Sequence, residues 1–177
     1  MEYKHNTFKI YTDGACVNNG KPNARCSIGI HFSNNNVLNM IDISRVLQVS
    51  KSTNNVAELT AIHEAIKQYA TTNLCMPLQI YSDSQYSINC ITKWYPSWVK
   101  KKCVDEKQNN KLIKAIYEDY CNIKNKVEDI QLIHIKAHTG LNDEHSIGNS
   151  IADKLATDAL KKFEKPKVDI RKFFPNV

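Results

Sequence analysis

The sequence has 177 residues, of which 42% are hydrophobic and 24% are charged, as is usual for a soluble globular domain with its own core. These figures exclude a disordered chain, a collagen and a coiled coil, and no apolar run is long enough to span a membrane. Lys and Arg number 24 against 18 Asp and Glu, and the resulting charge of +6 is compatible with a nucleic-acid partner.

The first part of the chain predicts three strands followed by a helix. Apolar and polar residues alternate up to Asp13 with the period of a strand, which we expect to end at Gly14. The links between the strands are short, so we expect an antiparallel meander. Its strands are predicted over residues 7–13, 26–32 and 37–49. From Asn55 the apolar residues recur at the spacing of one helical face.

The rest of the chain predicts two more strands among helices. The strands are expected over residues 78–82 and 130–135. The helices are expected over residues 84–91, 109–123 and 147–163, the last with a buried stripe of Ile147, Ile151, Leu155 and Ala159. A strand that follows a helix tends to run parallel to the earlier one. We therefore predict an α/β domain over residues 1–163, with a five-stranded mixed sheet and helices on both faces, and a C-terminal tail over residues 164–177.

The cysteine pattern predicts a reducing compartment. Six cysteines are present, and none forms a Cys-x-x-Cys pair or a Cys/His cluster with zinc spacing. The polar N-terminus does not resemble a signal peptide. We therefore expect an intracellular protein of the cytoplasm or nucleus that is not secreted, has no membrane partner and is a monomer.

Four acidic residues occupy positions that predict a metal site. Asp13 and Asp83 come at the ends of predicted strands, where open sheets bind ligands. Glu58 is in the first turn of a helix, and Asp153 is at the edge of an apolar stripe. Four converging carboxylates need divalent cations between them, and oxygen ligands favour Mg²⁺ or Mn²⁺ over zinc. Two such ions suit in-line phosphoryl transfer.

Each of these four residues also has a simpler structural interpretation. Asp13 before glycine could form a turn, and Glu58 could complete a capping box three residues after Asn55. Asp83 could cap the following helix, and Asp153 could be an ordinary boundary residue. The residues that accompany them decide between the interpretations.

Five motifs in order resemble the type 1 ribonuclease H family, over about residues 8–160. They are YTDGAC (11–16), TNNVAEL (53–59), IYSDSQY (80–86), IHIKAHTG (133–140) and GNSIADKLA (148–156). The resemblance implies the ribonuclease H fold and an endonuclease that cuts the RNA strand of RNA–DNA hybrids, leaving 5′-phosphate and 3′-hydroxyl ends. The predicted order of strands and helices is also that of this family.

The resemblance also implies roles for the acidic residues and one histidine. Asp13 would lie between two Mg²⁺ ions, which Mn²⁺ can replace. Asp153 would join Asp13 on the ion that activates water, while Glu58 and Asp83 hold the other. His138, in a polar loop, would help the product leave or shuttle a proton.

The same resemblance implies contacts to both strands of the hybrid. The residues expected to read the RNA strand are Cys16, Asn19, Asn54, Asn55 and Gln85. Those expected to bind the DNA strand are Lys51, Thr53, Tyr86, Trp94, Trp98 and Asn109. A basic protrusion with Lys93, Lys100, Lys101 and Lys102 would attract the hybrid by counterion release. The alternatives are a solvated lysine face and two core tryptophans.

Four features depart from the family pattern. The protrusion between Trp98 and Asn109 is short, which predicts weaker hybrid affinity. Residues 142–146 look like an insertion, and Ser150 stands where an acidic residue is common. Lys51 replaces a common arginine and loses its bidentate grip on phosphate.

Two other functions and one further partner were considered. Another nuclease of the same fold, such as an integrase or junction resolvase, would lack the AHTG and lysine-tryptophan segments, and an inactive hybrid-binding domain would not need four carboxylates. In the tail, Ile170, Phe173 and Phe174 have the spacing of peptides that dock on replication sliding clamps. Alternatively, these side chains fold back onto the domain.

Overall fold

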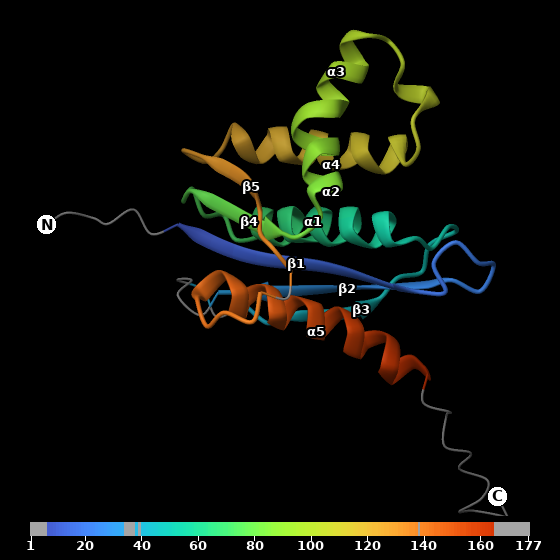
Figure 1. Ribbon diagram of the computed structural model, residues 1–177. Helices are drawn as coiled ribbons and strands as arrows, with labels where there is room; N and C mark the ends of the chain where they lie inside the picture. The colour runs from blue at the N-terminus through green and yellow to red at the C-terminus, as the bar shows by residue number, and fades with distance from the viewer. Residues whose placement is uncertain (1–6, 34–37, 39, 138, 165–177) are drawn as a thin grey trace, which may run out of the picture.

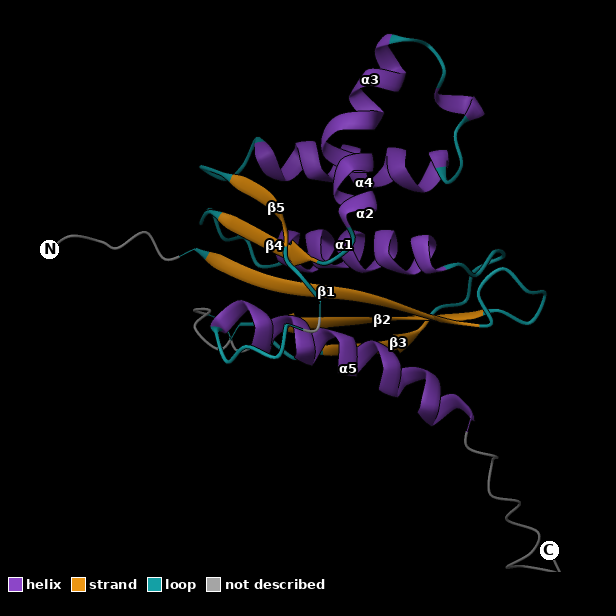
Figure 2. Cartoon of the chain, viewed as in Figure 1, coloured by secondary structure: helices purple, strands orange, loops and turns teal. Residues whose placement is uncertain are grey.

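The computed structural model describes residues 7–33, 38, 40–137 and 139–164. Five strands form one mixed sheet in the order β3-β2-β1-β4-β5, with helices on both faces, as predicted (Figures 1 and 2). The strands are β1 Phe8–Val17, β2 Arg25–Phe32, β3 Ile43–Val46, β4 Leu78–Ser82 and β5 Ile130–His134. The first three pair antiparallel, and β4 and β5 extend the sheet in parallel from β1.

The helices are divided between the two faces of the sheet. They are α1 Asn54–Ala70, α2 Gln85–Asn89, a π-helix Cys90–Trp94, α3 Tyr95–Lys100, a 3₁₀ turn Val104–Glu106, α4 Asn110–Lys124 and α5 Glu144–Glu164. Helix α5 covers one face of the sheet. Helix α1 covers the other face, and α4 packs on α1 (Figure 1). Helix α3 projects away from the sheet (Figure 1). Within the described part of the chain, none of the helices is both long and apolar enough to cross a membrane.

Strand β1 continues past the predicted end at Gly14. Its antiparallel pairing with β2 runs through Asp13 and Gly14 to Val17. The glycine does not end the strand because it has a packing role: a Cβ at this position would collide with the backbone of Ala57 and Glu58 in α1. The predicted strand end at Gly14 is therefore wrong, and so is the alternative interpretation of Asp13 as a turn residue.

Strand β3 is much shorter than the predicted strand over residues 37–49. At its start, the side chain of Asp42 accepts hydrogen bonds from the backbone N–H of Phe32 at 3.0 Å and the ring of His31 at 2.9 Å. A side chain thus takes the place of the next backbone bond, so the pairing of β2 with β3 begins at Ile30 and Ile43.

The buried face of α5 also differs from the predicted stripe. Ile147 is 47% exposed, whereas Ala152 and Ala156 are fully buried. These small residues let the helix lie directly on β2, where a Cβ at Gly29 would collide with the carbonyl oxygen of Ala152. The Ser27 hydroxyl donates to the carbonyl of Ala156 at 2.6 Å. At Ala152 and Ala156 the helix is therefore held by close backbone approach.

Candidate active site

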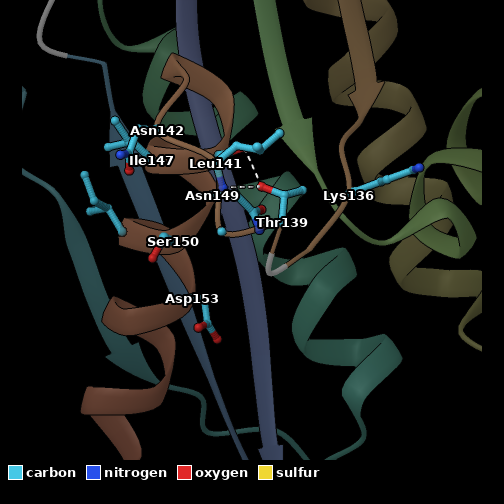
Figure 3. Close-up of a pocket in the computed structure, with 11 residues that line it drawn as sticks. Lys136, Thr139, Leu141, Asn142, Ile147, Asn149, Ser150 and Asp153 are labelled. Atoms are coloured by element: carbon cyan, nitrogen blue, oxygen red, sulfur yellow. Dashed lines mark hydrogen bonds between the residues drawn. The ribbon is translucent and has the colours of Figure 1, made fainter.

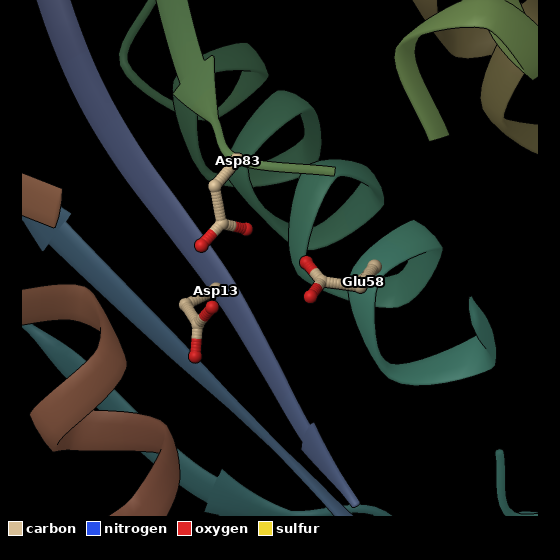
Figure 4. Close-up of side chains that lie close together, drawn as sticks. All are labelled: Asp13, Glu58 and Asp83. Carbon is tan, nitrogen blue, oxygen red and sulfur yellow. The ribbon is translucent and has the colours of Figure 1, made fainter. Parts of the chain in front are cut away.

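Three of the four predicted carboxylates meet at one point beside the sheet. One carboxylate oxygen each from Asp13 on β1, Glu58 on α1 and Asp83 after β4 lie within 4.8 Å of one another (Figure 4). Asp13 and Glu58 are buried and Asp83 is half-buried. Glu58 and Asp83, which follow Asp13 by 45 and 70 positions in the sequence, are thus brought to one site.

The sheet pairing explains how the two aspartates meet. The parallel pairing of β1 with β4 ends at Thr12 and Ser82, and Asp13 and Asp83 are the next residue on each strand. Because β4 ends there while β1 continues, space opens beside Asp13 at the carboxyl end of β4. Glu58 reaches this space because Gly14 allows α1 to approach β1 closely.

The structure contradicts the capping interpretations of Glu58 and Asp83. Helix α1 is capped by Thr53, whose hydroxyl accepts a bond from the Val56 N–H at 3.2 Å. Helix α2 is capped by Ser84. Glu58 is only 5% exposed, and its Oε2 atom has no hydrogen-bond partner among the described residues.

Burial and mutual repulsion raise the pKa values of Asp13 and Glu58 in the metal-free cluster. Burial, followed by the charges of Asp83 and Asp153, raises the pKa of Asp13 to about 7. Burial also raises the pKa of Glu58 well above its usual value, with further contributions from Asp13 and Asp83. A cluster that resists ionisation without cations is an arrangement that a bound cation would stabilise.

The fourth carboxylate, Asp153, lies at the edge of this cluster. It is half-buried on α5, and its charge raises the pKa of both Asp13 and Glu58. Its carboxylate oxygens do not belong to the group of Asp13, Glu58 and Asp83 oxygens that lie within 4.8 Å of one another. The Oδ1 atom of Asp153 is 3.5 Å from the Thr157 hydroxyl. Asp153 also lines a cavity of about 470 Å³ between α5 and the loop before it (Figure 3).

The raised pKa of Asp13 predicts a pH dependence of stability. In metal-free buffer, we expect the free energy of unfolding of the native protein, relative to Asp13→Asn, to fall as pH rises from about 4 to about 7. The folded state binds this proton more tightly than the unfolded chain, so its stabilisation is complete below pH 4 and is lost through pH 7. The expected change is on the order of 2–4 kcal/mol.

Denaturant unfolding across this pH range, with and without Mg²⁺, measures the effect. Burial opposes the ionisation of Glu64, but hydrogen bonds from Lys67 and Gln68 lower its pKa from 4.5 to about 2. Its stabilising contribution is therefore complete above about pH 4.5, is the same in both proteins and cancels in the difference. A difference that stays flat between pH 4 and 7, or that Mg²⁺ leaves unchanged at pH 7, would contradict the predicted cation site.

The predicted RNA-strand residues lie around the start of α1 and α2. Asn54 and Asn55 open α1, and the Asn54 N–H donates to Oδ1 of Asn19 at 3.2 Å. Cys16 is half-buried near the end of β1, and Gln85 is exposed at the start of α2. All five surround the acidic cluster in the chain, but the structure holds no nucleic acid, so their contacts stay predictions.

Two of the predicted DNA-strand residues share a cavity. Lys51 and Asn109, far apart in the sequence, both line a cavity of about 380 Å³ between the segment before α1 and the start of α4. Asn109 adopts a left-handed backbone with φ 60°, and its buried Nδ2 has no partner among the described residues. Thr53 caps α1 close by in sequence but does not line this cavity.

The predicted aromatic and basic residues follow the helices beyond α2. Trp94 packs against Tyr86 at 5.7 Å and against Trp98 at 6.3 Å between ring centroids. Trp94 is 38% exposed, whereas the other two rings also touch the core, so the core interpretation holds in part for them. The protrusion lysines Lys93, Lys100, Lys101 and Lys102 are all exposed.

Two groups of predicted residues lie outside the described parts of the chain. They are His138, and Ile170, Phe173 and Phe174 of the tail. Their proposed roles stay predictions from the sequence.

Sequence reasoning missed the residues that line the cavity beside Asp153. Asn149 is 3% exposed, and its Oδ1 has no partner among the described residues. Lys136 and Thr139 come from the opposite wall of this cavity (Figure 3). Asn149 lies in the motif GNSIAD, four residues before Asp153 and so on the same side of the helix. This spacing was the signal in the sequence that could have placed Asn149 at the site. His134 on β5 also lies near the acidic cluster, with its Nε2 atom 3.2 Å from the Asp83 carbonyl oxygen.

Comparison with known proteins points to one family. The profile of the RNase H family matches residues 5–161. Ribonuclease H1 from Homo sapiens is 33% identical over 160 residues, which cover 88% of this chain and 50% of that protein. The chain spans about half the length of the curated relatives it matches first.

Solved structures share the same fold. The solution structure of the PFV RNase H domain is 27% identical with a TM-score of 0.64, covering 86% of this chain and 93% of that domain. LC11-RNase H1 in complex with an RNA/DNA hybrid has a TM-score of 0.59 at 20% identity, covering 88% and 98% of the two chains. At this identity the second likeness concerns the fold alone.

Proposed function

Because this chain belongs to the type 1 ribonuclease H family, we propose that it cuts the RNA strand of RNA–DNA hybrids with the help of divalent metal ions. The observation that supports this most directly is the convergence of Asp13, Glu58 and Asp83 within 4.8 Å, with the charge of Asp153 acting on the first two. Four carboxylates without a nearby histidine or cysteine ligand in this described cluster suit phosphodiester hydrolysis better than acyl transfer or redox chemistry.

The donor set fits two Mg²⁺ ions, and Mn²⁺ offers the same preference for oxygen. The unpartnered Oε2 atom of Glu58 and the raised pKa of Asp13 both indicate that these groups need a cation to ionise fully. We propose that these four carboxylates would hold the ions, with Asp13 contributing to both, Asp153 to one, and Glu58 and Asp83 to the other. When bound, the ions would activate water and stabilise the leaving oxygen.

The protein's own residues would select and orient the hybrid. The RNA strand differs from DNA by its 2′-hydroxyl, which short polar side chains can read in the minor groove. Asn19 and Asn54 are tied together by a 3.2 Å hydrogen bond directly at the start of the helix that carries Glu58. A 2′-hydroxyl bound there would lie close to the acidic cluster, so recognition and cleavage would act on neighbouring nucleotides.

We propose that the DNA strand places a phosphate in the cavity between Lys51 and Asn109. Lys51 is exposed and can offer a positive charge, and Asn109 can offer the N–H of its unpartnered Nδ2. Lys111, which lines the same cavity, adds a second positive charge. Because lysine binds phosphate as a point charge, this grip would tolerate more geometries than an arginine fork.

The decisive experiment incubates the protein with labelled RNA–DNA hybrid and Mg²⁺, beside an RNA duplex and a DNA duplex of the same sequence. We expect cleavage of the hybrid RNA strand with 5′-phosphate products, no cleavage of either control, and loss of activity with a chelator. Cleavage of the DNA duplex would support an integrase-like or resolvase-like enzyme. Binding of the hybrid without cleavage, at any Mg²⁺ or Mn²⁺ concentration, would contradict the proposal.

The exposed lysines of the protrusion predict a salt-dependent contribution to binding. Replacing three of them by glutamine should weaken hybrid binding about tenfold and lower the slope of log K against log salt by about two to three, because each phosphate contact releases counterions. The substituted residues are Lys100, Lys101 and Lys102. Affinity measured by fluorescence anisotropy from low to physiological salt provides both quantities.

A charge-matched variant separates local contacts from net charge. It replaces three exposed lysines elsewhere by glutamine, namely Lys124, Lys126 and Lys162. This control should leave the slope near that of the native protein. Equal slopes for the two triple variants would show that the protrusion does not touch the hybrid.

A further inference from the structure

Strand β1 is connected to the start of α5 by a small set of polar contacts. The hydroxyl of Tyr11 lies 3.1 Å from Nδ1 of His145. Two residues earlier on the strand, Lys9 donates to both carboxylate oxygens of Glu144, at 2.7 and 2.8 Å. Gly148 rests on the Tyr11 ring so closely that a Cβ would come within 2.6 Å of it. Three residues within 144–148, which span little more than one helical turn, therefore contact two strand residues.

The ring of Tyr81 also contacts His145, by stacking rather than by a hydrogen bond. Tyr81 on β4 is the sheet partner of Tyr11, and their rings stack at 4.9 Å. Tyr81 also stacks on the His145 ring at 4.4 Å. Its hydroxyl, however, donates to Gln79 on its own strand at 2.8 Å. The two tyrosines thus offer similar rings to α5 but direct their hydroxyls differently.

From His145 a chain of hydrogen bonds continues into the loop beside the acidic cluster. Asp143 accepts from the His145 N–H at 3.0 Å and from the Ser146 hydroxyl at 2.6 Å. The Ser146 hydroxyl is 2.7 Å from the Thr139 hydroxyl, which accepts from the Leu141 N–H at 3.2 Å (Figure 3). Because each hydroxyl in this chain accepts one bond and donates the next in the same direction, the bonds polarise and reinforce one another. Residues 139–146 are thereby closed into one unit.

This unit lies on the face of the sheet that α5 covers, which is also the face on which Asp153 lies. Tyr11 and Asp13 are two residues apart on β1, so their side chains point to the same face. His145 and Asp153 are eight residues apart on α5, roughly two turns. Fixing His145 against Tyr11 therefore fixes how far Asp153 lies along the sheet relative to Asp13.

We propose that Tyr11 is a positioning residue, whose hydrogen bond to His145 holds α5 and the loop at Thr139 in place beside the acidic cluster. The proposal rests on the proposed function for its catalytic consequence but not for the contact itself. It also gives residues 142–146, which depart from the family pattern, a specific task. Their side chains Asp143, Glu144, His145 and Ser146 all take part in holding the helix start.

The test compares two tyrosines with the same substitution. Tyr11→Phe removes the hydroxyl that meets His145, while Tyr81→Phe removes the hydroxyl that meets Gln79 and leaves both rings stacked. We expect Tyr11→Phe to lower kcat for hybrid cleavage about three- to tenfold with KM changed less than about twofold, and Tyr81→Phe to keep both near native values. Equal kcat for the two variants would overturn the proposal.

Three further variants separate positioning from a general loss of stability. His145→Asn keeps an acceptor near the position of Nδ1 and should retain more activity than His145→Leu, although both lose the ring. Thr139→Val removes the loop hydroxyl from this chain of hydrogen bonds. Combined with Tyr11→Phe, it should therefore lower kcat by less than the product of the two single effects. Effects that multiply fully would show that Tyr11 does not act through the loop.

Hydrogen exchange provides a measurement that does not depend on cleavage. Tyr11→Phe should speed exchange of the amides of Leu141 and Ser146 at least about tenfold, while Tyr81→Phe leaves them unchanged. If the native protein cut no hybrid at all, the proposed function would fail, yet exchange would still decide the positioning role. Unchanged exchange in Tyr11→Phe would overturn that role even in an active enzyme.

Discussion

Asp13→Asn is expected to lower hybrid cleavage by at least about a thousandfold while the protein stays folded and binds hybrid. A carboxylate oxygen of Asp13 lies within 4.8 Å of one each from Glu58 and Asp83, and the charges of Asp83 and Asp153 both act on Asp13. Loss of a metal ligand removes several kcal/mol of charge stabilisation in the transition state, and each 1.36 kcal/mol corresponds to tenfold in rate. Single-turnover cleavage with excess enzyme measures the chemical step directly.

A matched substitution on the surface tests whether the effect is specific. Asp158→Asn removes a carboxylate on α5 whose bond to Lys161, at 3.4 Å, is exposed, and it should keep native activity. Activity of Asp13→Asn within tenfold of the native protein would remove the basis for the assigned site. A cooperative unfolding transition at or above the native temperature in metal-free buffer is expected, since the change also removes repulsion.

Gly29→Ala is expected to lower the free energy of unfolding by about 3 kcal/mol or more. The added Cβ would collide with the carbonyl of Ala152 and lie 2.6 Å from the backbone N of Ala156, and neither is a flexible side chain. Helix α5 would have to move away from β2, carrying Asp153 with it. We therefore expect cleavage to fall as well, at temperatures where the variant is still folded.

The control for this change is Gly20→Ala, in the turn after β1. Gly20 has φ +79° but nothing within 4 Å of an added Cβ, so its cost should be about 1–2 kcal/mol, from backbone strain alone. Urea unfolding of both variants gives the comparison. If Gly29→Ala were no worse than Gly20→Ala, the close approach of α5 to β2 would not be a constraint in solution.

The regular elements were predictable where one physical signal dominated. Helix α1 was predictable because its apolar stripe faces a continuous core, and it begins at Asn54, one residue before the predicted start. Strand β4 has the predicted bounds, since it is a short apolar run between turns. Strand β1 and helix α5 were partly mispredicted because Gly14 and Ala152 act through backbone contacts made by other elements, which no local pattern contains.

The site was predictable in its composition more than in its geometry. Asp13 and Asp83 were found through the expectation that chemistry lies at strand ends, although only β4 ends there. Glu58 could not be separated from a capping residue until Thr53 was seen to cap α1. The shared cavity of Lys51 and Asn109 depends on how α4 packs on α1, a tertiary contact that the sequence does not encode locally.

The short edge strand β3 has a consequence for how the protein behaves at high concentration. An open sheet edge offers unpaired backbone groups on which a second molecule can add a strand. Here the edge is four residues long, Asp42 already occupies the N–H of Phe32 where the pairing would continue, and the charged Arg45 stands in the middle. Edge-to-edge aggregation through β3 is thereby discouraged, so concentrated protein is expected to stay free of sheet-to-sheet pairing at this edge.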